Sequence, residues 1–195
     1  MKPIPDWDNI KPAHPGDLPE SPPPGPYICR IVNVDETTSK AGQPMIKLDI
    51  DIDEGVFKDF FYNDFKSLKA RGWEPRWSLS IFQLFNGNSA PFFKGLIDDI
   101  QKSNPNFKFD FNTSKLVGKR LVVMLDSDEY NYNGSVRTRL KAGRTFTVKQ
   151  FANGECGEPF VIGTDGKRRK LSSQPPPPPE PMPEDYDVSE LDIPF

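Results

Sequence analysis

Proline is concentrated at the two ends of this chain, and this distribution limits where a fold can form. Of the 22 prolines in 195 residues, nine lie within residues 1–26 and eight within residues 175–195. Because proline lacks a backbone N–H and has a fixed φ, dense proline opposes both helices and central strands. The sequence therefore predicts a disordered leader over residues 1–24, one folded domain over residues 25–171 and a disordered tail over residues 172–195.

The middle of the chain can still bury a core, although only 35% of all residues are hydrophobic. The proline-rich ends account for part of this low value. No apolar run approaches the ~18–20 residues of a membrane span, and the N-terminus lacks a basic-then-apolar signal region. We therefore expect a cytoplasmic protein with no membrane partner.

The chain has one histidine, His14, and two cysteines, Cys29 and Cys156. A Ser–His–Asp or Cys–His nucleophile needs a positioned imidazole, and His14 lies in the proline-rich leader. Structural zinc sites need more Cys and His ligands than this chain has. The two cysteines allow one disulfide, but a reducing compartment fits so few cysteines better. We expect a protein that is not an enzyme and holds no metal or cofactor.

Charge divides the chain into three unlike parts. The net charge is −3 overall, the sum of −2 for residues 1–24, +5 for the middle and −6 for residues 174–195, which contain no Lys or Arg. A basic domain followed by an acidic tail favours a polyanion as partner of the domain and a separate role for the tail. The simpler alternative is that the tail only aids solubility.

Short strand patterns open the domain, and helical patterns follow them. We predict three meandering strands at Tyr27–Val34, Met45–Asp53 and Val56–Tyr62; the second alternates apolar and polar residues with period two. Residues 63–112 favour helices, with candidates at Leu79–Phe85 and Ala90–Lys102.

Strand patterns then resume. Lys119–Leu125 and Ser135–Lys141 flank Asn133-Gly134, a strong hairpin signal, and a short element covers Thr145–Phe151. Residues 153–170 are rich in loop signals. The pattern predicts a mainly β fold, a small barrel of the oligonucleotide-binding (OB) type with a helical insert. An open α+β sheet fits almost as well.

One predicted strand carries a regular row of cations. Arg137, Arg139 and Lys141 alternate with apolar residues and would form a row about 13 Å long at ~3.3 Å per residue. Tyr130 and Tyr132 lie just before the hairpin turn. Aromatic side chains beside a cationic groove favour sequence-tolerant single-strand binding, because bases stack on the rings while cations bind phosphates. The alternative is an ordinary solvated strand face.

Further aromatic and basic residues extend the candidate DNA-binding set. If Val56–Tyr62 is a strand, either Phe57 and Phe61 or Phe60 and Tyr62 face the core, and the other pair is covered by the helices or stacks on bases. Tryptophans and cations are also mixed in a predicted loop around residues 66–77. The rest of the candidate set is Lys47, Lys58, Phe60, Tyr62, Trp73 and Arg76.

The carboxylates Asp49, Asp51 and Asp53 suggest a different chemistry. Paired carboxylates can hold Mg²⁺ in a nuclease. Here they lie on the regular polar face of one predicted strand, and no matching acid–lysine pattern follows. The expected metal site is therefore none, and a nuclease is the rival interpretation.

The end of the chain resembles the C-terminal tip of bacterial single-stranded-DNA-binding proteins. In that family an acidic stretch closes in Asp-Ile-Pro-Phe, as Asp192, Ile193, Pro194 and Phe195 do here, although Leu191 interrupts the acidic run. The resemblance implies that these four residues recruit replication or repair proteins, an apolar anchor with a carboxylate being a known mode of peptide capture.

The domain resembles a bacteriophage family, some of whose members are single-stranded-DNA-binding proteins with an OB-type core. The resemblance spans roughly residues 24–170 and rests mainly on turns and packing positions. Its motifs are Pro24-Gly25-Pro26-Tyr27, Ser39-Lys40-Ala41-Gly42-Gln43-Pro44-Met45, Phe92-Phe93-Lys94-Gly95, Lys102-Ser103-Asn104-Pro105 and Leu116-Val117-Gly118-Lys119.

We therefore predict a sequence-nonspecific single-stranded-DNA-binding protein of phage replication or recombination, acting in the bacterial host cytoplasm. The domain would coat DNA, and the tail would recruit partners and could compete with DNA for the same cations. Homo-oligomers are compatible with the sequence. The alternatives are a metal-dependent nuclease or junction-processing enzyme using Asp49 and Asp51, and an adaptor whose proline-rich segments bind partner domains.

Overall fold

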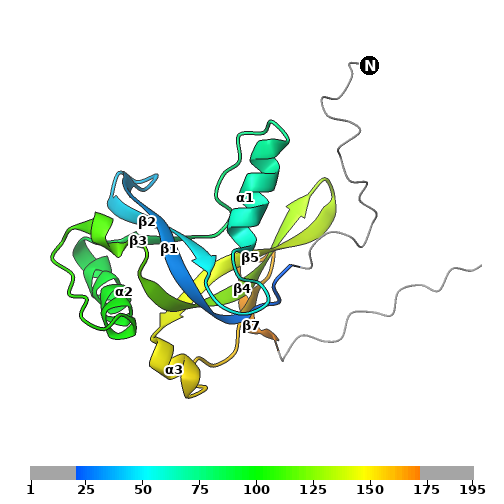
Figure 1. Ribbon diagram of the computed structural model, residues 1–195. Coiled ribbons are helices and arrows are strands. Elements are labelled where there is room, and N and C mark those ends of the chain that lie inside the picture. Colours follow the sequence, from blue (N-terminus) through cyan, green and yellow to red (C-terminus); the bar gives the residue numbers. More distant parts are fainter. Residues whose placement is uncertain (1–20, 172–195) are drawn as a thin grey trace, which may run out of the picture.

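The computed structural model describes residues 21–171, so nearly all of the predicted leader and tail lies outside the described range. Within this range seven strands form one sheet, and three α-helices and two short 3-10 helices surround it (Figure 1). In chain order the elements are β1 (Gly25–Thr38), β2 (Pro44–Ile52), α1 (Phe60–Ala70), β3 (Ser80–Leu84), η2 (Gly87–Ser89), α2 (Ala90–Ser103), η3 (Thr113–Leu116), β4 (Arg120–Tyr132), β5 (Ser135–Phe146), α3 (Val148–Ala152), β6 (Phe160–Ile162) and β7 (Arg168–Lys170).

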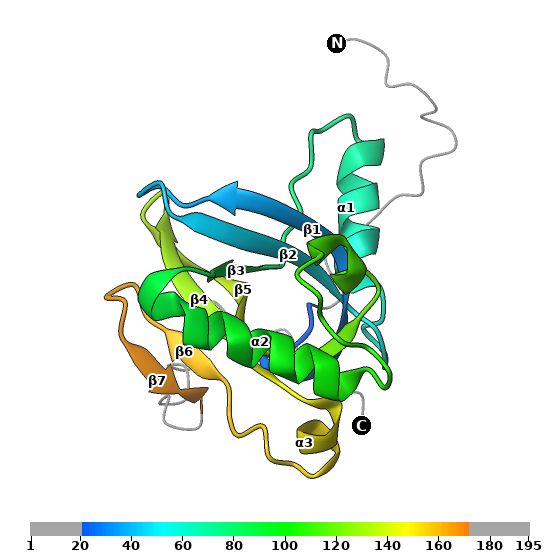
Figure 2. The same ribbon diagram turned by 90° about the vertical axis from the view of Figure 1, so that its left-hand side faces the viewer.

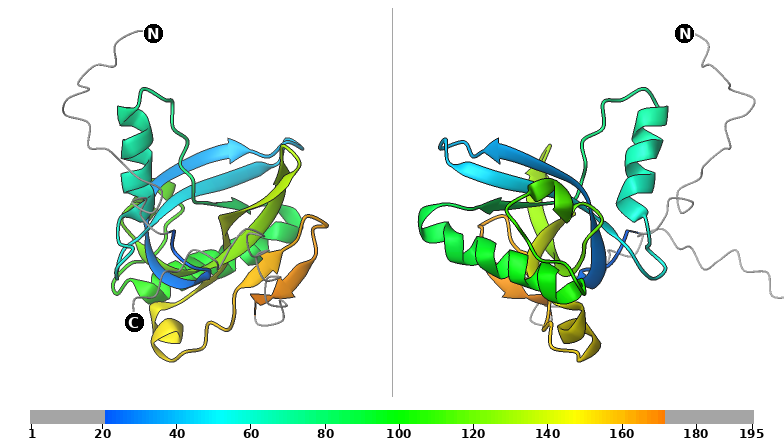
Figure 3. Two further views of the ribbon diagram at one scale, coloured as in Figure 1. Left: turned by 90° about the vertical axis from the view of Figure 1, so that its right-hand side faces the viewer. Right: turned by 60° about the vertical axis from the view of Figure 1, so that its left-hand side comes forward.

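The sheet has the strand order β3-β2-β1-β4-β6-β7, and β5 pairs with the other edge of β4. All pairs are antiparallel except β4 with β6. The sheet curls so that β3 comes beside β5 (Figure 3), but within residues 21–171 no hydrogen-bonded ladder joins these two strands. The predicted mainly β class with helices is confirmed, and closure of a barrel stays a prediction.

Strand β2 shows why the sequence folds into this sheet. Its apolar residues Ile46, Leu48, Ile50 and Ile52 are fully buried, as the period-two pattern predicts. Helix α2 lies across one end of the curled sheet (Figure 2) and packs Leu96, Ile97 and Ile100 into the same core. None of the helices between residues 21 and 171 is long and apolar enough to cross a membrane.

The predicted third strand, Val56–Tyr62, is wrong. Residues 53–59 form a turn, and α1 begins at Phe60. The buried carboxylate of Asp51 causes this difference, because it accepts the backbone N–H groups of Phe61 and Tyr62, each at 3.1 Å. These N–H groups lie in the first helical turn, where a carboxylate stabilises a helix. The side chain of Asp51, ten residues before Phe61, therefore determines that this segment forms a helix.

The predicted helix at Leu79–Phe85 is also wrong, because this segment is strand β3. Leu79 and Ile81 are buried, whereas Phe82 is exposed, and β3 pairs with the edge of β2 from Ser80 to Leu84. The helical insert is therefore interrupted by a strand that completes the β1–β2–β3 meander.

The last third of the domain departs from prediction in detail. The hairpin at Asn133-Gly134 is confirmed, with φ values of 50° and 80° that suit a type I′ turn. The predicted short element at residues 145–151 divides into the end of β5 and helix α3, which Thr147 caps. The predicted loop at residues 153–170 contains β6 and β7. Cys29 and Cys156 are buried, free thiols in separate clusters.

Candidate nucleic-acid interface

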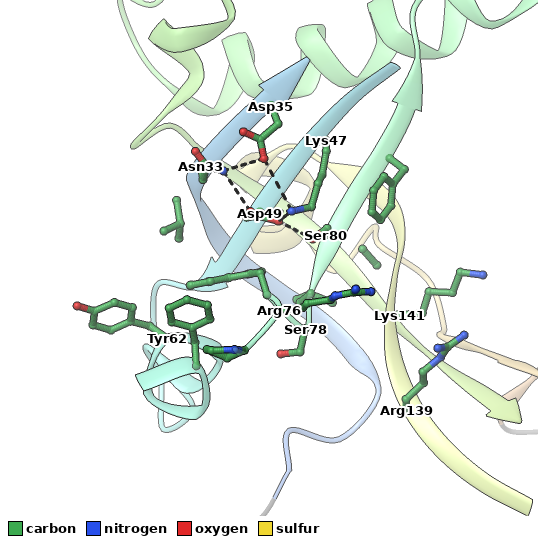
Figure 4. A pocket seen from close by; sticks show the side chains of 17 residues that line it. Asn33, Asp35, Lys47, Asp49, Tyr62, Arg76, Ser78, Ser80, Arg139 and Lys141 are labelled. Carbon is green, nitrogen blue, oxygen red and sulfur yellow. Dashed lines mark hydrogen bonds and ion pairs between the residues drawn. The ribbon is translucent and has the colours of Figure 1, made fainter. Parts of the chain in front are cut away.

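A groove of about 820 Å³ lies on the outer face of the sheet. Strands β1, β2 and β3 form its floor, α1 and the loop before β3 form one wall, and β5 forms the other (Figure 4). Its lining comprises Val32, Asn33, Asp35, Lys47, Asp49, Tyr62, Phe65, Pro75, Arg76, Trp77, Ser78, Leu79, Ser80, Phe82, Arg139, Lys141 and Ala142.

Five residues that the sequence selected as DNA contacts meet around this groove although they come from four separate segments. They are Lys47 of β2, Tyr62 of α1, Arg76 of the following loop, and Arg139 and Lys141 of β5. Nothing in the local sequence places these segments together. Their convergence results from the curl of the sheet, which brings β5 opposite β3.

The remaining predicted contacts lie outside the groove lining. Arg137, Tyr130 and Tyr132 continue along the β4–β5 hairpin past Arg139. Phe60 packs between Phe57 and Phe61 in an edge-to-face cluster against the core. The last two, Lys58 and Trp73, are exposed and do not belong to the groove lining.

A polar network occupies the groove floor. Asp49 accepts a hydrogen bond from the Ser80 hydroxyl at 2.6 Å, and its carboxylate lies 2.9 Å from Lys47 Nζ. Asn33 Nδ2 donates to Asp35 at 3.0 Å and to Asp49 at 3.3 Å. Because Asp49 is buried and surrounded by donors, the network holds Lys47 in place. Its two carboxylates and one cation leave the floor with a formal charge of −1, and the other three cations of the lining outweigh it.

Aromatic side chains present apolar surface to the groove. Phe82 of β3 is 59% exposed and Tyr62 of α1 is 42% exposed, and both line the cavity. Trp77 and Phe65 also line the groove; their ring centroids are 5.5 Å apart, and Trp77 donates its indole N–H to the Ile50 carbonyl at 2.9 Å. Sequence reasoning missed Phe82 because it assigned this segment to a helix; the alternation of Leu79 and Ile81 with Ser80 and Phe82 was the available signal.

Asp51 fixes the position of α1 beside the groove. Its carboxylate is fully buried, accepts three backbone N–H groups and lies 4.0 Å from the guanidinium of Arg30. Burial raises the pKa of Asp51, and the N–H donors and Arg30 oppose that rise. Because two of the donors belong to Phe61 and Tyr62, Asp51 controls where the Tyr62 ring stands.

The β4–β5 hairpin extends the cationic row beyond the groove. Arg137 lies over the Tyr132 ring at 4.7 Å, and Arg139 lies over the Tyr130 ring at 5.3 Å. Arg139 also pairs with Asp128 at 2.7 Å. Cation–π contacts of this kind keep a guanidinium close to an aromatic face, so the hairpin holds charge and stacking surface side by side.

The carboxylates of the rival nuclease interpretation are engaged by protein donors. Asp49 and Asp51 were expected on a solvent-facing strand surface, and both are instead buried. Among residues 21–171, no group of three or more His, Cys, Asp or Glu side chains is arranged to hold a metal ion. The four predicted tip residues from Asp192 to Phe195 lie outside the described residues.

Comparison with known proteins assigns this chain to no family. No protein-family model matches the sequence, and no curated protein is significantly similar to it.

Proposed function

We propose that this protein binds single-stranded DNA without sequence preference, through the groove and the adjoining β4–β5 hairpin. The observation that carries the proposal is the meeting of exposed aromatic rings, Phe82 and Tyr62, with exposed cations, Arg76 and Lys141, in one open groove. Rings bind the faces of unpaired bases and cations bind the phosphates between them.

Charge and strand order support the same proposal. The groove lining contains four cations and two carboxylates, and both carboxylates take part in the floor network. Within residues 21–171, Arg76 and Lys141 form no ion pair, so they are available to phosphate. The order β3-β2-β1-β4-β5 is the order of an OB-type barrel, a common scaffold for single strands.

The proposal includes the rest of the predicted role. The acidic C-terminal tip recruits replication or repair proteins while the domain coats DNA in phage replication or recombination. This part rests on the resemblance of the chain end and on the contrast between a basic domain and a tail of net charge −6.

Titration of a fluorescent single strand and of the matching duplex tests the proposal. We expect the single strand to bind more tightly, because the base faces of a duplex are already stacked, and log K should fall with log salt at about −0.7 per phosphate contacted. Lys141→Gln should make that slope shallower by about 0.7, while Lys149→Gln, on α3 outside the groove lining, should leave it unchanged.

Equal affinity for the duplex, or a binding constant independent of salt, would contradict a stacking groove. The same titration with Mg²⁺ tests the rival enzyme. We expect the labelled strand to stay intact. If the wild type cleaves it and Asp49→Asn does not, the protein is a nuclease and the proposed binding function is wrong.

A further inference from the structure

The strand register shows that the cationic surface continues beyond the groove. Arg139 of β5 pairs with Asp128 of β4, Asp128 pairs with Ile162 of β6, and Ile162 pairs with Arg168 of β7. Residues directly opposite in neighbouring strands point to the same face of a sheet. Arg168 therefore stands on the same face as Arg139, and Lys170, in register with Phe160, stands beside it.

Two cationic ridges thus flank the part of the sheet surface that β4 and β6 form, here called the β4–β6 surface. The first ridge is the β5 row Arg137, Arg139 and Lys141, and the second is the exposed β7 pair Arg168 and Lys170. Strand β7 lies at the edge of the sheet (Figure 2). Three strand-to-strand steps of about 4.8 Å place the ridges about 14 Å apart.

The β4–β6 surface is not a negative barrier between the ridges. Its two carboxylates are buried and engaged: Asp128 pairs with Arg139, and Asp126 accepts the Phe160 N–H at 2.8 Å. Half-buried Phe160 and Ile162 lie on the same surface, and the Arg144 guanidinium lies 4.8 Å from the Phe160 ring. A strand crossing here meets apolar and aromatic surface between two sets of cations.

We infer that a single strand longer than the groove continues over the β4–β6 surface and binds the β7 ridge through Arg168 and Lys170. Arg139 connects the two parts, because it lines the groove and also starts the row that ends at Arg168. This inference rests on the proposed function and assigns a second phosphate-binding segment that only long strands reach.

Two variants of β7 with the same charge change provide the test. Arg168→Gln removes a cation from the ridge, whereas Arg169→Gln removes one from the next residue, which points to the opposite face and pairs with Asp165. Both are measured by fluorescence anisotropy on oligo-dT of about 8 nucleotides, within the range of about 4–16 nucleotides that one OB domain covers, and of about 30 nucleotides, well above that range.

We expect Arg168→Gln to bind the short probe as the wild type does, and to bind the long probe with a salt slope shallower by about 0.7. Arg169→Gln should match the wild type on both probes. Equal effects of the two variants, or no effect of Arg168→Gln on the long probe, would overturn the inference while leaving the groove intact. Failure of the wild type to bind the short probe would overturn the proposed function, and the extension with it.

Discussion

Phe82→Ala is the most informative change to the proposed groove, because Phe82 was not among the residues that the sequence selected. The side chain is 59% exposed on β3 and lines the groove opposite β5. Base–aromatic stacking contributes about 1–3 kcal/mol per base, which corresponds to a Kd about 5- to 140-fold weaker when the ring is lost. Burial of a whole Phe contributes about 1.5–3 kcal/mol, so removing this partly buried ring should lower the free energy of unfolding by only about 1 kcal/mol.

The salt dependence separates stacking from charge in this experiment. Phe82→Ala removes no cation, so the line of log K against log salt should shift downward and keep its slope. Phe92→Ala is the matched control, since Phe92 is 70% exposed and lies on α2 outside the groove lining. Anisotropy titrations at several salt concentrations measure both quantities. An unchanged Kd, a changed slope, or an equal loss in Phe92→Ala would refute the assignment of Phe82 as a stacking platform.

Three further changes have defined outcomes. Replacing Arg137 and Arg139 together by Ala should make the salt slope of single-strand binding shallower by about one unit in total, and an unchanged slope would remove the hairpin from the interface. Asp51→Asn should lower the free energy of unfolding by about 1–3 kcal/mol in denaturant titrations, because the amide group faces a helix N–H. The pKa of Asp51 is raised in the folded state, so protonation of Asp51 stabilises the fold. The difference in the free energy of unfolding between the wild type and Asp51→Asn should therefore grow as pH falls toward the ordinary Asp range. A difference that does not change with pH would contradict this. Phe195→Ala keeps all six acidic side chains of the tail, so it should leave DNA affinity unchanged and weaken capture of host proteins about thirtyfold, a loss of ~2 kcal/mol for one anchor; equal capture by both forms would reduce the tip to a solubilising segment.

The parts of the fold that the sequence predicted are those with long, unambiguous periodicity. Strand β2 alternates over nine residues, and α2 places Leu96, Ile97 and Ile100 on one helical face. The Asn133-Gly134 turn needs positive φ at both positions, which these residues adopt readily. In each case the signal lies within the segment itself.

The two segments in which strand and helix were exchanged have a common physical cause. The run from Phe57 to Tyr62 contains aromatics that suit either a strand or a helix, and the carboxylate of Asp51 on the neighbouring strand decides between them. In β3 the alternation is only five residues long and takes its meaning from pairing with β2. Contacts between distant segments settled both cases, and a periodicity test within one segment cannot detect such contacts.

The residue types of the candidate site could be predicted from the sequence, but their positions in space could be predicted only in part. Lys47, Tyr62, Arg76, Arg139 and Lys141 were selected for charge and aromaticity, and the curled sheet brings them to one groove. Phe60 was selected for the same reason and packs instead against the core, because the helical turn directs it toward Phe57 and Phe61.

The cations of the groove should not contribute equally to binding, because their surroundings differ. Lys47 is paired with Asp49 in the floor network, and Arg139 is paired with Asp128, so part of the charge of each is already neutralised. Arg76 and Lys141 are exposed and form no ion pair within residues 21–171. Counterion release scales with the phosphates that cations neutralise, so Arg76 and Lys141 should dominate the salt slope. The paired cations should instead keep a fixed position. Lys47 lies directly opposite Phe82 on the neighbouring strand. A phosphate bound by Lys47 would therefore fix where its base can stack on the Phe82 ring.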